Sequence, residues 1–69
     1  MNAIGKAVGK RIQRYRLKKG FTQEVLAFEA GLHRAYVGQI ERGEKNIGII
    51  NLQKIAKALG IKMSRLLEG

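Results

Sequence analysis

The apolar residues of the chain recur at intervals of three and four positions, which is the spacing of one face of an α-helix. In the first segment this face consists of Ile4, Val8, Ile12 and Tyr15. The pattern is clearest after Gly48, where positions i, i+3, i+4 and i+7 are all apolar: Leu52, Ile55, Ala56 and Leu59. Because the helical period runs through the chain and no sustained alternation of strand type appears, we predict an all-α fold.

Glycine residues divide the pattern into five short helices. The turn signals lie at Gly20, Gly31, Gly60 and within 43–48. The expected helices are a first one that ends before residue 20, followed by 23–30, 34–42, about 48–59 and 63–67. Thr22 is the expected N-cap of the second helix, since its side chain can accept a hydrogen bond from a free backbone N–H group. With no linker and no repeat, residues 1–69 are expected to form one domain.

The composition adds a strong positive charge to this helical chain. Its 69 residues include 14 Lys and Arg but only five Asp and Glu, which gives a net charge of +9. A balance of this kind favours a polyanionic partner, either nucleic acid or an anionic membrane surface. The chain has no Cys, so disulfides and thiolate metal sites are excluded. No apolar run is long enough to span a bilayer, and the N-terminus lacks a secretory signal, so we expect a cytoplasmic protein.

The middle of the chain predicts a helix-turn-helix over about residues 22–42. The expected helices 23–30 and 34–42 are joined by three residues that begin with Gly31, which permits the positive φ angle of a sharp turn. Ala27 is small enough for a close helix crossing, and Leu32 can fill the space between the two helices. Together these spacings are specific, although a glycine between two helices is weak by itself.

Two stretches carry a family pattern. The first, 22–43, contains TQEVLA at 22–27, AGLHRAYV at 30–37 and IERG at 40–43, and the second is NLQKIAKALG at 51–60. From about residue 12 to the C-terminus the chain resembles the Cro/C1-type (XRE) helix-turn-helix transcriptional regulators. The resemblance implies a five-helix, lambda-repressor-like domain that binds double-stranded DNA, and no cofactor is expected. The residues do not favour an enzyme, because the one histidine has no nucleophile: Ser64 is remote in sequence and Thr22 is needed as a cap. Within the family, the run 31–36 and the absence of a second domain are similar to stand-alone regulators, including restriction–modification controller proteins.

The expected third helix, 34–42, would be the recognition helix. Its apolar positions 36, 37 and 40 face the core, so the opposite face carries Arg34, Ala35, Gly38, Gln39 and Arg42. In the major groove arginine pairs with guanine and glutamine with adenine. The resemblance implies base-reading positions for Arg34, Ala35 and Gln39. The alternative for Arg34 is a solvated or phosphate-contacting arginine. Gly38 stands where the family usually has a small polar residue. Either the glycine lets the helix approach the groove more closely, or the difference has no role.

Further residues are candidates for contacts with the DNA backbone. The resemblance implies that Gln23 anchors the second helix to phosphate, where the alternative is an ordinary helix-forming residue. Lys45 and Asn46 follow the recognition helix and are either backbone contacts or solvated residues. Tyr36 combines a packing ring with a hydroxyl that can reach phosphate. His33 is the only histidine, and no Asp or Cys is present to complete a metal site, so a metal is not expected. Capping or a phosphate contact is the favoured role of His33.

Two structural expectations follow from the resemblance. The first is a partly buried ion pair between Arg16 and Glu41 that joins the first helix to the third. The second is a homodimer on a palindromic operator, because one small domain reads too few base pairs to specify a site. The expected interface lies in about residues 47–69 and comprises Ile47, Ile49, Ile50, Ile61, Met63, Leu66 and Leu67. The alternative is that these residues complete the core of the monomer.

Two other functions compete with DNA recognition. One is a protein-interaction or antitoxin-like module that uses this fold without reading DNA sequence. The other is a membrane-surface peptide, suggested by the cationic stripe Lys6, Lys10, Arg14 and Lys18. The core needs the apolar face of the first helix, which favours a solvated stripe that attracts DNA. Glu24 and Glu29 are candidates for a contact with RNA polymerase, but the sequence does not separate an activator from a repressor.

Overall fold

The computed structural model describes residues 3–68, with side chains from residue 5 onward, and is all-helical over this range. The helices are α1 (Ala3–Lys18), α2 (Gln23–Ala30), α3 (Arg34–Glu41), α4 (Ile49–Leu59) and α5 (Met63–Leu67). The expected all-α, five-helix architecture is therefore confirmed. One boundary differs, since Arg42 is the C-cap of α3 and not its last residue. The side chain of Ile4 lies outside the described set.

The ends of α2 have the local chemistry that the sequence predicts. Thr22 is the N-cap, and its hydroxyl oxygen accepts a hydrogen bond from the Val25 backbone N–H at 3.0 Å. At the other end Gly31 has φ 70° and ψ 36°, a left-handed conformation that an L-residue with a Cβ adopts only with strain. The turn that follows begins α3 with His33 as N-cap, but the histidine side chain makes no capping hydrogen bond.

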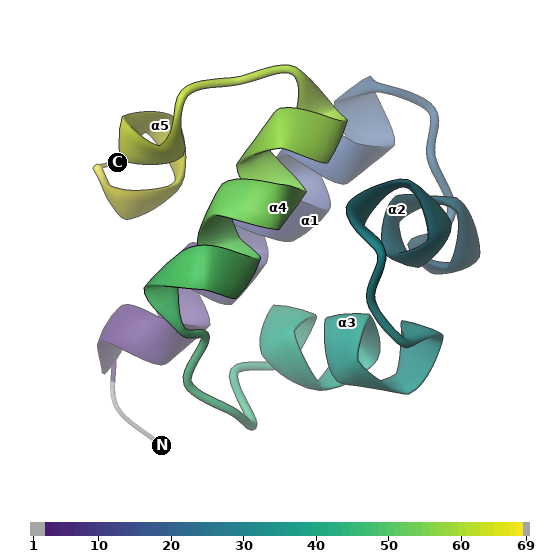
Figure 1. The fold of residues 1–69 in the computed structure, drawn as a ribbon. Coiled ribbons are helices and arrows are strands. Elements are labelled where there is room, and N and C mark those ends of the chain that lie inside the picture. The colour runs from purple at the N-terminus through teal and green to yellow at the C-terminus, as the bar shows by residue number, and fades with distance from the viewer. Residues whose placement is uncertain (1–2, 69) are drawn as a thin grey trace.

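The five helices pack around one core (Figure 1). In this view α4 crosses in front of α1. Helix α2 lies to the right of these two helices, α3 to the lower right, and α5 to the upper left. Among the residues whose side chains are described, twelve buried apolar side chains form the core: Val8, Ile12, Leu26, Ala27, Ala30, Val37, Ile40, Leu52, Ile55, Ala56, Leu59 and Leu66. Since Val8 and Ile12 are among them, the apolar face of α1 is occupied by the core and does not face solvent.

Helix α1 approaches the end of α3 very closely at Gly9. A Cβ atom at this position would overlap the carbonyl oxygen of Ile40 and lie 2.8 Å from that of Glu41. Gly9 is buried, and both neighbours are backbone atoms, which cannot rotate away. The contact between the two helices therefore depends on a glycine that the sequence pattern did not single out.

The ion pair expected between Arg16 and Glu41 is present and ties the same two helices together. Arg16 Nε donates to Glu41 Oε2 at 2.7 Å and Arg16 Nη2 donates to Oε1 at 3.0 Å. The two side chains are only 9% and 2% exposed. Arg16 Nη1 also donates to the carbonyl oxygen of Phe21 at 2.8 Å. The guanidinium thus fixes the α1–α2 turn as well as α3, and orients the helix that follows.

Candidate nucleic-acid interface

The outer surface of α3 begins with two exposed residues. Arg34 and Ala35 are exposed at its first turn, whereas Val37 and Ile40 on the opposite face are buried. Gln39 is half-buried beside them. Side chains at the start of a helix are the ones that reach base edges when a recognition helix enters the major groove. The three residues predicted to read bases thus occupy one turn and a half of the same helix, with Arg34 and Ala35 the most accessible.

Gly38, predicted on the outer face of α3, is buried, because two polar side chains cover it. A Cβ at Gly38 would lie 3.2 Å from Arg42 Nη1 and 3.6 Å from Gln23 Oε1. The side chain of Arg42 folds back over the preceding turn of α3, and Gln23 reaches across from α2, so that both cover the glycine. The absence of a side chain at position 38 makes room for these two polar groups.

Gln23 occupies the first turn of α2, as expected, but its amide is already engaged. Its Nε2 donates to Glu41 Oε1 at 3.0 Å, which extends the buried ion pair towards the surface. The bond fixes the orientation of the side chain and leaves it half-buried. A contact between Gln23 and a phosphate would therefore use a side chain that Arg16 and Glu41 hold in place.

Tyr36 joins α3 to α4 through its hydroxyl group. The oxygen accepts a hydrogen bond from Asn51 Nδ2 at 3.1 Å, and the ring packs partly buried against the core. Sequence reasoning placed Asn51 only within a family motif and missed this role. The available signal was a polar residue in the first turn of α4. His33 is exposed at the start of α3, next to Arg34.

The loop after α3 contains a second ion pair, which the sequence analysis also missed. Arg42 Nε lies 2.7 Å from Glu44 Oε2, and Arg42 Nη2 donates to Oε1 at 3.1 Å. The hydrogen bond from Arg42 lowers the pKa of the Glu44 carboxyl, and Glu44 in turn raises the pKa of Arg42. Lys45 and Asn46 follow and are exposed. Opposite charges two residues apart across Gly43 were the available signal.

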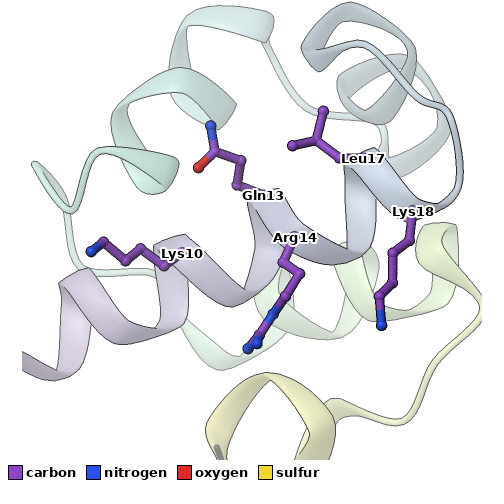
Figure 2. A pocket seen from close by; sticks show the side chains of 5 residues that line it. All are labelled: Lys10, Gln13, Arg14, Leu17 and Lys18. Carbon is purple, nitrogen blue, oxygen red and sulfur yellow. The ribbon is translucent and has the colours of Figure 1, made fainter.

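A cationic surface runs along α1 and is shown in Figure 2. Lys10, Arg14 and Lys18 line a shallow hollow together with Gln13 and Leu17. Arg14 and Lys18 extend towards α5, whereas Gln13 and Leu17 point to the opposite side of the helix. Over residues 3–68 no helix is long and apolar enough to cross a bilayer, and no three potential metal ligands gather. The cations of α1 are thus displayed on a helix whose apolar face lies in the core.

The residues expected at a dimer interface divide into three groups. The prediction is wrong for Leu66, which has no exposed surface because it belongs to the core, where α5 packs against α1 and α4. Ile47, Ile61 and Met63 are half-buried and pack against the core of the same chain. Only Ile49, Ile50 and Leu67 remain largely exposed, at 63%, 67% and 49%. The available apolar surface is therefore smaller than the sequence suggested.

The arrangement of α2 and α3 defines a helix-turn-helix DNA-binding domain, and comparison with known proteins gives the same class. A family model described as helix-turn-helix matches residues 12–66. Control protein C.BamHI of Bacillus amyloliquefaciens is 44% identical over 68 residues, which are 97% of this chain and 84% of the relative. The crystal structure of the restriction–modification controller protein C.AhdI from Aeromonas hydrophila matches with a TM-score of 0.92 and 43% identity, over 94% of this chain and 98% of that one.

Control protein C.MunI of a Mycoplasma species is 37% identical over 67 residues, 96% of this chain and 90% of its own. The chain thus belongs to the helix-turn-helix family of Cro/C1-type DNA-binding transcriptional regulators, as the sequence resemblance implied. Its members regulate transcription and are not enzymes. The chain also shares its five-helix fold with C.AhdI.

Proposed function

We propose that the chain is a homodimeric regulator that reads a palindromic DNA operator with α3 in the major groove. The observation that carries the proposal is the exposed pair Arg34 and Ala35 at the first turn of α3, on a helix whose other face is fixed in the core. Around them Gln23, His33, Tyr36, Gln39, Lys45 and Asn46 are proposed to complete the contacts with bases and backbone. The net charge of +9 supplies the long-range attraction to DNA.

The dimer is proposed to form through Ile49 and Ile50 at the start of α4 together with Leu67 of α5. These three large apolar side chains are exposed in the single chain. Burying each would contribute roughly 1–2 kcal/mol, given about 1.5–3 kcal/mol for a fully transferred side chain. In a two-fold dimer the recognition helices would lie about 34 Å apart, one turn of B-DNA. Ile47, Ile61 and Met63, which pack partly buried against the core, would contribute only their exposed edges.

We further propose that the chain controls a restriction–modification system in the bacterial cytoplasm. Support comes from its similarity to C.BamHI and C.MunI, both named control proteins, and to the controller protein C.AhdI. Glu24 and Glu29 are exposed on α2, and we propose them as the residues that would contact RNA polymerase. A protein-interaction module on the same fold is the second candidate, and sequence-specific DNA binding separates the two.

The base-reading role of α3 predicts a loss of specificity in Arg34→Ala. We expect the affinity for the operator to fall by about 1–3 kcal/mol per half-site, since a bidentate contact between arginine and guanine contributes this much discrimination. Binding to an unrelated duplex should change far less. Competition titrations with both duplexes measure the ratio, and Arg14→Ala on the cationic surface of α1 is the matched control. Equal losses on both duplexes for Arg34→Ala would contradict base reading.

The interface proposal predicts that Ile50→Glu is monomeric. A glutamate there would be buried without a partner in the dimer but is solvated in the monomer, so it should dissociate the dimer without unfolding the chain. Sedimentation velocity measures the mass, and operator affinity should fall with it. Leu17→Glu is the control, because Leu17 is 61% exposed on α1, outside the proposed interface. A dimeric Ile50→Glu protein would show that α4 is not the interface.

A further inference from the structure

The ion pair at the end of the recognition helix is bidentate although both partners are exposed. Arg42 offers Nε and Nη2 to the two oxygens of Glu44, at 2.7 and 3.1 Å. The side chains are 58% and 45% exposed, so water and other anions reach both groups. Exposed pairs of this kind contribute little to folding, because the charges are almost as well solvated apart. The pair is therefore easily opened by a competing anion.

The backbone nevertheless holds Glu44 beside Arg42. Gly43, between them, has φ 73° and is buried, and an added Cβ would lie 2.7 Å from Lys6 Cγ on α1. The N–H groups of Gly43 and Glu44 donate to the carbonyl oxygens of Ile40 and Gln39 at 3.0 and 2.9 Å. These bonds cap α3 and fix the chain reversal. Glu44 is thus placed at the arginine by a packed turn.

Arg42 is also directed towards the proposed DNA surface. Its Nη1 and the Oε1 of Gln23 both lie within 4 Å of the point where a Cβ of Gly38 would stand. The guanidinium therefore sits next to the side chain proposed to anchor the first turn of α2 on phosphate. Gln23 is in turn fixed by its bond to Glu41 at 3.0 Å. Arg42 at the end of α3 and Gln23 on α2 thus both lie against Gly38.

We propose that Glu44 occupies, in the free protein, the place that a DNA phosphate takes at Arg42 in the complex. This inference rests on the proposed DNA binding and adds Arg42 to the contact residues. A phosphate presents oxygens to the guanidinium fork in the same bidentate manner as a carboxylate. Binding exchanges one anion for the other, so Glu44 lowers the affinity of the chain for any duplex. It acts through Arg42 and not through general repulsion.

A double-mutant cycle tests this exchange. Dissociation constants are measured for the operator and for an unrelated duplex with the wild type, Glu44→Gln, Arg42→Ala and the double variant. We expect Glu44→Gln to bind both duplexes about two- to fivefold more tightly per protomer, the range of an exposed ion pair. Arg42→Ala should reduce the slope of log K against log salt concentration by about 0.9 per protomer, as loss of one phosphate contact requires.

The double variant decides between exchange and simple repulsion. In the Arg42→Ala background the change Glu44→Gln should have little effect, because the cation for which glutamate competes is gone. Glu68→Gln changes an exposed glutamate that follows α5, and it controls for the added net charge. Equal tightening by Glu44→Gln in both backgrounds, or no tightening in either, would overturn the inference alone. A wild type that binds no duplex would overturn the proposed function and the inference with it.

Discussion

Replacing Glu41 by glutamine should lower the free energy of unfolding by about 3 kcal/mol. Removing one partner of a buried ion pair leaves the other charge uncompensated and costs about 3–5 kcal/mol. Arg16 would be stranded in this way, since its side chain is 9% exposed and its Nε and Nη2 both donate to Glu41. A domain of this size has a total stability of roughly 3–10 kcal/mol, so the variant lies close to unfolding at room temperature. Urea denaturation followed by far-ultraviolet circular dichroism measures the loss.

The control for this prediction lies three residues further along the chain. Glu44→Gln also removes a carboxylate from a bidentate pair with arginine, but that pair is exposed. We expect its stability to change by less than about 1 kcal/mol. A loss in Glu41→Gln no larger than that in Glu44→Gln would contradict the structural role assigned to the buried pair. Because Gln23 donates to Glu41, a folded Glu41→Gln protein should in addition bind DNA less tightly.

Gly9→Ala is expected to destabilise the fold by up to about 2 kcal/mol. The added methyl would overlap the carbonyl oxygen of Ile40 and lie 2.8 Å from that of Glu41, so α1 and α3 have to move apart. Overpacking of this kind costs about 1–3 kcal/mol and occasionally more. Alanine gains about 1 kcal/mol of helix propensity over glycine, which offsets only part of the cost. Thermal and urea denaturation of the variant measure the net change.

Gly38→Ala is a matched control, since Gly38 is also a buried glycine within a helix. There the new methyl would meet the end of the Arg42 side chain at 3.2 Å, and a flexible side chain can move aside. We expect this variant to be as stable as the wild type or slightly more stable, because it keeps the gain in helix propensity. If Gly9→Ala were as stable as Gly38→Ala, the close approach of α1 to α3 would not be needed for the fold.

The helices and their order could be predicted from the sequence, because periodicity and capping are local. Thr22, Gly31 and Gly60 stand at the helix ends where their chemistry requires them. The core faces of α1 and α4 also follow from the spacing of Val8, Ile12 and the apolar residues of the last long helix. What the sequence could not show was distance between helices. Gly9 looks like any helical glycine until α3 is placed against it.

The candidate site was predictable in its residue types but not in its internal bonds. A helical wheel puts Gly38 on the outer face, yet the side chains of Arg42 and Gln23 cover it. Which donor pairs with which acceptor depends on how α2 crosses α3, so the bond from Gln23 to Glu41 needed the structure. For Leu66 the error is the opposite one, because a residue that was predicted to be at the surface is buried. The excess of apolar residues near the C-terminus predicted an interface, but Leu66 belongs to the core.

In the proposed function α3 reads DNA sequence as part of a two-fold dimer. The most direct test is selection of random duplex DNA by the wild-type protein at near-physiological salt, scored for the enriched sequence and its symmetry. We expect a palindrome with half-sites about ten base pairs apart, since the recognition helices of a dimer are one turn of DNA apart. Binding without any enriched sequence would contradict the claim, because only the electrostatic attraction to phosphate would then remain.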